Sequence, residues 1–126
     1  MELINNALNA PRPVGPYSQA VKSSGLIFCA GQIALDPKTG QLVEGGLEAQ
    51  TMQVLDNLCA VLKASGANFN KVVMTTIYLT DIAQGPGVNK IYGKFANPDT
   101  PPARQTVVVK ELPLGALVEI SVIAEI

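Results

Sequence analysis

The chain has 126 residues, of which 48% are hydrophobic and 15% are charged, and its formal net charge at pH 7 is −1. This length predicts one domain, residues 1–126, and the near-neutral charge argues against a nucleic acid or an acidic membrane surface as partner. No apolar run approaches the roughly 20 residues of a membrane helix, so we expect a cytoplasmic protein.

The first half of the chain predicts two strands and a long helix. Proline and glycine in "PRPVGPY" argue against regular structure before Tyr17. Two strands are expected from there to about residue 35, around a turn at Ser24 and Gly25. After a second turn at "DPKTGQ", apolar residues recur at helical spacing from Leu47 to Leu62. This spacing predicts an amphipathic helix that ends before Gly66.

The second half predicts a further strand, a short helix and a hairpin. Residues 71–82 are rich in β-branched side chains, and residues 85–96 again place apolar side chains at helical spacing. Residues 104–109 and 117–126 are expected to pair as a hairpin around the turn "ELPLGA". The order of elements predicts an α+β sandwich, a mixed β-sheet with two helices on one face.

The expected hairpin carries two opposite charges, Arg104 and Glu119. If its strands pair directly, both lie on the sheet face turned away from the helices, opposite a core set that includes Val107 and Val109. A solvated cross-strand ion pair is one interpretation. The same face, however, has three apolar residues that would need covering by another subunit: Val108, Leu117 and Ile123. Charges on a covered face point instead to a functional site.

The chain contains no His, which removes the commonest general base and the usual partner of a Ser or Cys nucleophile. Cys29 and Cys59 lie in the apolar segments "LIFCAG" and "LDNLCAVL". They are expected to be free, buried thiols, without a disulfide or a metal. Any chemistry must therefore rely on carboxylates, Arg, Tyr, the backbone and water.

Five segments together resemble the signature segments of the Rid family of reactive-intermediate deaminases, the YjgF-like proteins: "APRPVGPYSQAV", "CAGQIALDPKTG", "VNKIYGKF", "PPARQTVVV" and "ALVEISVIA". The resemblance spans nearly the whole chain. It implies a chorismate-mutase-like fold and a homotrimer whose sheets form a central barrel, with ligand sites between neighbouring subunits. It also implies hydrolysis of 2-imino acids, formed from 2-aminoacrylate or 2-aminocrotonate, to 2-oxo acids and ammonia without a cofactor.

The resemblance also implies site residues. Arg104 corresponds to the family's carboxylate-binding Arg, Glu119 to its cleft Glu, and Tyr17 to its N-terminal cleft Tyr. An Arg fork suits a carboxylate, while Glu119 is expected to orient or deprotonate the attacking water or to stabilise the positive nitrogen. The residues alone leave a simple packing role for Tyr17 equally open.

Further substrate-binding positions follow from the same comparison of motifs. Gly31 matches a glycine whose backbone lines the family's pocket. Ala30 and Thr106 stand where family members often have Ser and Cys, so a hydroxyl contact is lost at the first position and a polar γ atom is kept at the second. The residues alone, without the family comparison, add Asn89 beside Val88 on the second helix as a weaker candidate, because Asn near a helix start is often only a local cap.

Two other functions remain open from the sequence. One is a non-catalytic trimer that binds or senses a small acid in the Arg104 cleft. The other is an RNA-directed role, because some members of the resembled family are described as ribonucleases or translation inhibitors. The pI near 5.3 and the 5% aromatic content argue against RNA binding.

Overall fold

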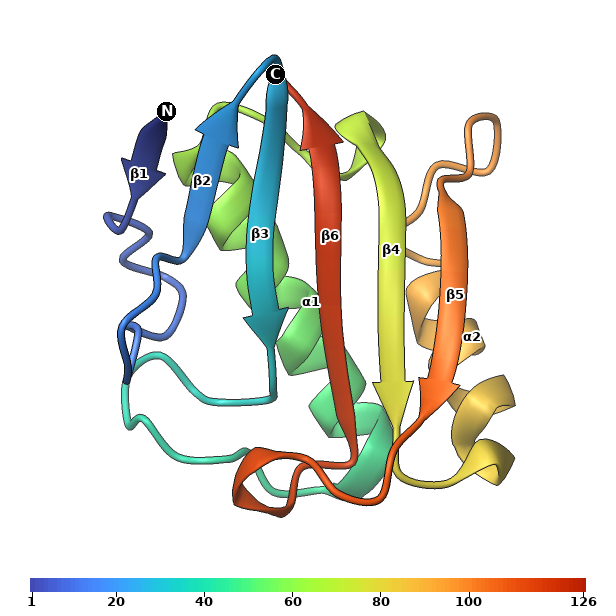
Figure 1. Ribbon diagram of the computed structural model, residues 1–126. Coiled ribbons are helices and arrows are strands. Elements are labelled where there is room, and N and C mark those ends of the chain that lie inside the picture. Colours follow the sequence, from blue (N-terminus) through green and yellow to red (C-terminus); the bar gives the residue numbers. More distant parts are fainter.

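The computed structural model covers residues 1–126 and has one six-stranded sheet with two helices on the same face (Figure 1). The strands are β1 (Glu2–Ile4), β2 (Ala20–Ser23), β3 (Leu26–Gln32), β4 (Val72–Leu79), β5 (Ala103–Val108) and β6 (Val118–Glu125). The helices are α1 (Gly46–Ala64) and α2 (Gly85–Tyr92), and three short 3-10 turns cover Phe69–Lys71, Ile82–Gln84 and Pro113–Gly115. The predicted α+β class is confirmed.

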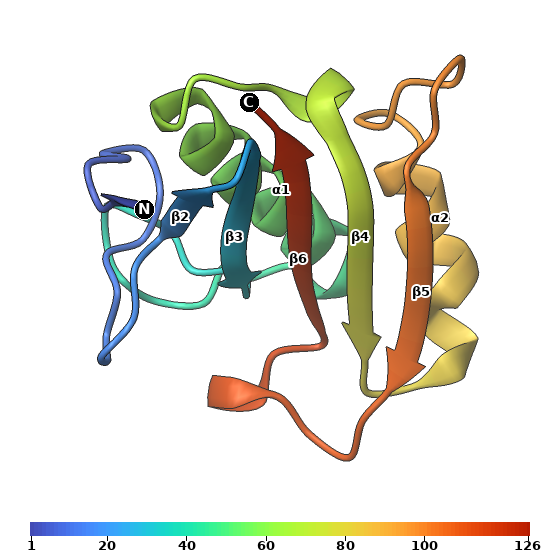
Figure 2. The ribbon, with the colours of Figure 1, turned by 45° about the horizontal axis from the view of Figure 1, so that its top comes forward.

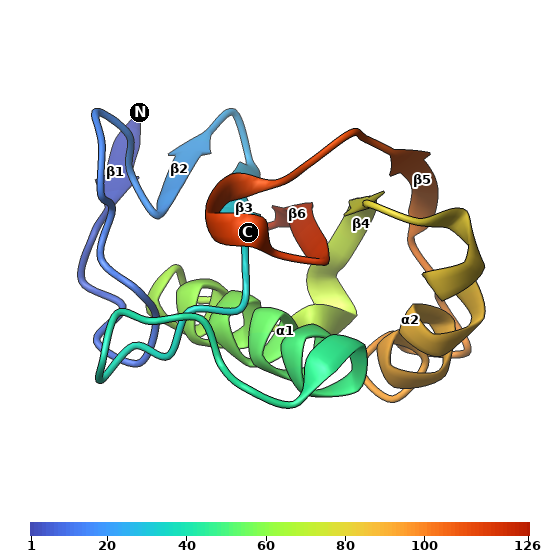
Figure 3. The same ribbon diagram turned by 90° about the horizontal axis from the view of Figure 1, so that it is seen from below.

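The sheet order is β1-β2-β3-β6-β4-β5. Strand β6 runs antiparallel to both of its neighbours, β3 and β4, whereas β4 and β5 are parallel. Helix α1 connects β3 to β4 and α2 connects β4 to β5, so the molecule contains two βαβ units with β6 inserted into the first. Figure 3 looks roughly along the strands and shows both helices on one side of the sheet and no helix on the other.

The hairpin between β2 and β3 forms where the sequence predicts it. Ser23 pairs with Leu26, and the two turn residues have positive φ, 52° at Ser24 and 80° at Gly25. Two consecutive left-handed residues define a type I′ turn, which suits the twist of paired strands. Strand β1, which pairs antiparallel with β2 at the sheet edge, was missed because three residues carry too short an alternating pattern to detect.

The core lies between the sheet and α1. The predicted apolar stripe of α1 is buried, including Leu55, Leu58 and Leu62, and it faces the buried side of β6, which includes Ile120 and Val122. Burial of each large aliphatic side chain is worth about 1.5–3 kcal/mol, so this interface dominates the stability of the fold. Neither helix combines the length and the hydropathy needed to cross a bilayer.

Both cysteines are free, as expected, but only Cys29 is buried, whereas Cys59 is half-buried. Burial raises the pKa of the Cys29 thiol to about 12. Burial and the nearby Asp56 carboxylate raise the pKa of the Cys59 thiol to about 11. Because the thiolate is the reactive form, neither sulfur is suited to be a nucleophile near neutral pH.

The predicted hairpin between residues 104–109 and 117–126 is wrong. Strand β5 pairs in parallel with β4, and the segment that follows β5 passes the end of β4 to reach β6 (Figure 1 and Figure 2). The alternating patterns of two strands do not reveal that a third strand lies between them. Val107, expected in the core, is 41% exposed on the open face.

The new pairing also changes the face on which Arg104 lies. Arg104 is opposite Thr75 and Thr106 is opposite Ile77, and both β4 residues are buried on the helix side. Because paired residues share a face, Arg104, Thr106 and Val108 lie on the helix side at the sheet edge. Glu119 pairs with Tyr78 on the open side. Arg104 and Glu119 therefore lie on opposite faces of one chain.

Candidate active site

Glu119 lies in a pocket with mostly apolar walls. It alternates with the buried Val118 and Ile120 on β6 and so points away from the helices. The pocket has a volume of about 580 Å³, and its walls come from the N-terminal loop, the end of β3 and the turn before β6. It includes four of the predicted site residues: Tyr17, Ala30, Gly31 and Glu119.

A β-bulge places the backbone of Gly31 beside the Glu119 carboxylate. Cys29 pairs with Val122 and Gln32 pairs with Ile120, so two residues of β3, Ala30 and Gly31, face a single residue of β6. A Cβ atom at Gly31 would lie 2.7 Å from Oε2 of Glu119 and 3.1 Å from its Cδ. Only glycine at this position leaves the carboxylate its observed place.

Glu119 has no partner of opposite charge in its own chain. The one ion pair of the chain joins Lys22 and Glu2 at 3.7 Å, far along the sheet. Partial burial raises the pKa of the Glu119 carboxyl above its ordinary value of 4.5. The solvated Arg104–Glu119 pair considered above is therefore absent, and Glu119 has the higher proton affinity expected of a general base.

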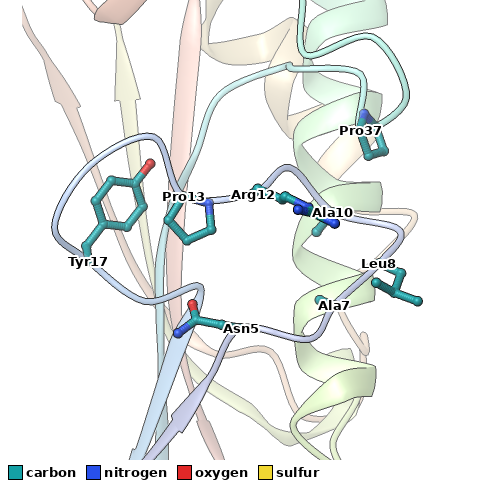
Figure 4. Close-up of a pocket in the computed structure, with 8 residues that line it drawn as sticks. All are labelled: Asn5, Ala7, Leu8, Ala10, Arg12, Pro13, Tyr17 and Pro37. Carbon is teal, nitrogen blue, oxygen red and sulfur yellow. The ribbon is translucent and has the colours of Figure 1, made fainter.

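Tyr17 forms part of the pocket rim, and its side chain is 51% exposed. Its hydroxyl accepts a hydrogen bond from the backbone N–H of Val14 at 3.3 Å, which curls the loop around the ring. The other side of this loop encloses a second cavity of about 630 Å³ with a mostly polar lining, shown in Figure 4. That cavity includes Tyr17 but none of the other predicted site residues.

Three buried amide side chains fix the loops around the Glu119 pocket. Gln19 accepts from the N–H of Ala7 at 3.0 Å and donates to the carbonyl oxygens of Ala7 and Pro11. Asn57 of α1 donates to the carbonyl oxygen of Leu35 at 2.9 Å. Similarly, Gln50 accepts from the N–H of Leu117 at 2.9 Å, beside the start of β6. Buried amides rarely remain without partners, so these bonds define the loop positions.

Arg104 is held at the other end of the sheet. Its guanidinium carbon lies 5.2 Å from the centroid of the Tyr92 ring, a cation–π contact. The Tyr92 hydroxyl shares a 2.9 Å hydrogen bond with Oγ1 of the buried Thr75. The guanidinium therefore stacks on an anchored ring, and no carboxylate of the chain lies within salt-bridge distance of it.

Thr106 and Asn89 line a smaller pocket of about 260 Å³ between β5 and the start of α2. Arg104 precedes Thr106 by two residues, so both side chains project from the same side of β5.

The predicted site residues thus fall into two sets. We call the set of Tyr17, Ala30, Gly31 and Glu119 the acidic half-site. The set of Arg104, Thr106 and Asn89 is the basic half-site.

Sequence reasoning missed the aliphatic wall of the acidic half-site. Two exposed residues, Val14 and Leu114, and two deeper ones, Ile33 and Leu35, line the pocket with Glu119. In the sequence these residues lie in three separate loops, and no periodic pattern connects them. The buried amides were also missed, since the residue type of Gln or Asn gives no signal of burial.

The fold and the two half-sites define a small α+β protein that presents a carboxylate pocket on one sheet face and a guanidinium at the opposite edge. Residues 7–126 match the sequence model of a family described as "Endoribonuclease L-PSP". A RutC family protein of Synechocystis sp. is 48% identical, with 98% of this chain and 95% of the relative covered.

Two further relatives carry the Rid name. Reactive Intermediate Deaminase A, chloroplastic, of Arabidopsis thaliana is 50% identical over 91% of this chain and 61% of the relative. The solved structure of YyfA, a Rid family protein of Yersinia pestis, has a TM-score of 0.94 and 47% identity, covering 99% of this chain and 98% of that one. The chain belongs to the Rid, or YjgF-like, family.

Proposed function

We propose that the protein hydrolyses reactive 2-imino acids, such as 2-iminopropanoate and 2-iminobutanoate, to 2-oxo acids and ammonia without a cofactor. The observation that carries this proposal is the Glu119 carboxylate, partly buried with a raised pKa in a pocket of its own. Such a group binds a proton more readily than an ordinary carboxylate and suits activation of water. The family membership, with a deaminase among the relatives, supports the same chemistry.

The active unit is proposed to be a homotrimer in which the acidic half-site of one subunit meets the basic half-site of the next. Within a single chain the two half-sites cannot act together, because Arg104 and Glu119 lie on opposite faces of the sheet. Apposed in neighbouring copies, they would place a carboxylate-binding fork opposite a base. The open sheet face favours such association, because it exposes Phe28 and Val107 beside the half-buried Met74 and Ile123.

The apolar face differs from the sequence-based expectation in its members. Of the three residues predicted to need covering, Ile123 lies on the open face, paired with Phe28 and Met74. Val108 lies on the helix side, and Leu117 precedes β6. The reason for expecting association is unchanged, but its residues now come from four adjacent strands, β3, β6, β4 and β5.

The reaction needs few groups because the carbon of an iminium ion is already electrophilic. The neighbouring subunit's Arg104 binds the substrate carboxylate with its planar fork and aligns the imino carbon. Glu119 accepts a proton from water as the oxygen of that water bonds to the carbon. Glu119 then gives this proton to the nitrogen of the tetrahedral intermediate. The carbon–nitrogen bond breaks as the hydroxyl group becomes the carbonyl, and the hydroxyl proton passes to the departing ammonia. The iminium ion and water are thus converted to a 2-oxo acid and ammonium. The role proposed for Tyr17 is to shield the cleft.

The decisive assay couples the protein to a PLP-dependent amino-acid dehydratase and follows 2-oxo acid release above the uncatalysed rate. We expect an acceleration proportional to the concentration of the protein. Binding of a 2-oxo acid without any acceleration would instead support the non-catalytic binding trimer.

The trimer is tested by multi-angle light scattering of the purified protein in dilute buffer. We expect a mass of about three times the 13.2 kDa of the chain, since a closed ring of copies covers every open face. A replacement of Ile123 with Lys puts a charge on the apolar face and should shift the mass downward, whereas Lys at Leu8, which is exposed and lines neither half-site, is a matched control. A folded wild-type monomer would contradict both the trimer and the shared site.

Gly31→Ala tests the placement of the Glu119 carboxylate. The backbone of Gly31 does not need the left-handed region, so alanine should fold, but its methyl group must displace Oε2 from its position. A displacement of about 1 Å costs on the order of a hundredfold in rate, so kcat should fall at least roughly tenfold. Thermal unfolding checks that the fold is kept. Wild-type kcat in the folded variant would show that the carboxylate position does not matter.

A further inference from the structure

We propose that Leu114 is a specificity-determining residue and that it selects 2-imino acids with branched or longer aliphatic side chains. The inference rests on the proposed function and names the substrate class of the same pocket. Leu114 lies in the short turn Pro113–Gly115, directly before β6, and lines the pocket that contains Glu119. Nothing in the catalytic steps above requires this side chain.

The turn itself does not explain a leucine at this position. Leu114 has φ 58°, ψ 21°, a left-handed conformation that is unfavourable for a leucine and easy for Gly or Asn. The following Gly115, with φ 72°, continues the same left-handed path. The turn would be more stable with Gly or Asn at position 114, so the backbone conformation does not explain why the side chain there is a leucine.

The location of the side chain supplies one. Leu114 is 72% exposed in the isolated chain although it is large and apolar, and Val14, across the same pocket, is 85% exposed. Ile33 and Leu35 continue the aliphatic surface toward the interior of the pocket. Three loops thus contribute branched side chains around one carboxylate.

The size of the pocket agrees with an extended substrate side chain. Its volume of about 580 Å³ lies in the range that accommodates ligands much larger than a three-carbon imino acid. A substrate whose carboxylate binds the neighbour's Arg104 and whose imino carbon faces Glu119 has only its side chain left to contact the rest of the pocket. An aliphatic side chain would bury apolar surface against Leu114 and Val14, whereas a methyl group would leave most of that surface wet.

Arg12 is the competing feature, because it lines the same pocket and is not ion-paired. A guanidinium there would favour a second carboxylate on the substrate. Arg12 is exposed and also borders the polar N-terminal cavity of Figure 4, whereas the aliphatic residues line the Glu119 pocket and not that cavity. The aliphatic class is therefore favoured, and a dicarboxylic substrate is an outcome of the test.

The test compares wild type with Leu114→Asn, which keeps a side chain of similar size that tolerates the left-handed turn but replaces the apolar surface with an amide. The matched control is Leu8→Asn, because Leu8 is 83% exposed and lines only the N-terminal cavity. One amino-acid oxidase generates the imino acids of leucine and of 2-aminobutanoate, so that both substrates come from the same source. The measured quantity is the ratio of the two kcat/KM values, after subtraction of uncatalysed hydrolysis.

We expect wild type and Leu8→Asn to favour the leucine-derived imino acid, and Leu114→Asn to lower that preference by roughly tenfold, as loss of apolar contact in a pocket typically does. Calorimetry with 4-methyl-2-oxopentanoate and 2-oxobutanoate measures the same preference without catalysis. If no imino acid is turned over but the binding preference is present and is lost in Leu114→Asn, the proposed hydrolysis fails and the role of Leu114 stands.

Three results would overturn the inference: equal preference in wild type and Leu114→Asn, tighter binding of the dicarboxylic oxaloacetate than of 4-methyl-2-oxopentanoate, or dissociation of the Leu114→Asn trimer. The last result would assign Leu114 to the contact between subunits rather than to the substrate.

Discussion

Replacement of Arg104 with alanine is expected to lower kcat/KM for a 2-imino acid by at least roughly a hundredfold, because the fork both binds and aligns the substrate carboxylate. We expect KM to rise and kcat to fall. Arg104→Lys keeps the charge but loses the planar fork and its stacking on Tyr92, so it should recover only part of the loss. Steady-state kinetics with the coupled dehydratase assay measures all three proteins.

Arg104 is exposed at the sheet edge, so its replacement should leave thermal unfolding almost unchanged. Unaltered kcat/KM in a folded Arg104→Ala protein would remove the carboxylate-binding role and, with it, the basic half-site.

Mixing of two inactive variants tests whether the site is shared between subunits. In hybrid trimers of Arg104→Ala and Glu119→Gln chains, an acidic half-site of the first type can meet a basic half-site of the second. Random assembly of equal amounts makes about a quarter of the clefts complete, so activity should return to about that fraction of wild type. A site within one chain would give no recovery, because every chain lacks one of the two residues.

Glu119→Gln is expected to lower kcat by roughly a hundredfold or more, while binding of a 2-oxo acid persists, because the amide keeps the shape and loses the base. In wild type, burial raises the pKa of Glu119 above its ordinary value of 4.5, and a bound substrate carboxylate neutralises the neighbour's Arg104. The kcat of wild type should therefore fall as the pH drops through this raised pKa. The same acid limb should be missing from the residual activity of the variant.

The stability of this variant provides an independent check. A raised carboxyl pKa in the folded state means that the ionised form is penalised by folding, and this penalty is fully present only above the raised pKa. Glu119→Gln should therefore be at least as stable as wild type at pH 7, and the difference should disappear below the ordinary Glu pKa. A marked loss of stability at pH 7 would assign Glu119 a structural role instead.

The elements with a local pattern were predicted correctly. The apolar positions of α1 repeat with the helical period, so the buried face from Val54 to Leu62 could be read directly from the sequence. The alternation along β6 gave the buried Val118 and Ile120 and the outward Glu119 in the same way. The turn at Ser24 and Gly25 was equally local, because its conformation depends on its own two residues.

The sequence by itself therefore determined which segments form the two helices and strands β2 to β6, which side of α1 and β6 is buried, and, through its family motifs, which residues are candidates for the site. Only the tertiary structure decided that β4 lies between β5 and β6 and that Arg104 and Glu119 point to opposite faces. A period of two identifies a strand without identifying its neighbour, and the pairing assumed for β5 placed each of its side chains on the opposite face from the one observed. The aliphatic pocket wall also depended on folding, because its residues come from loops far apart in sequence that buried amides bring together.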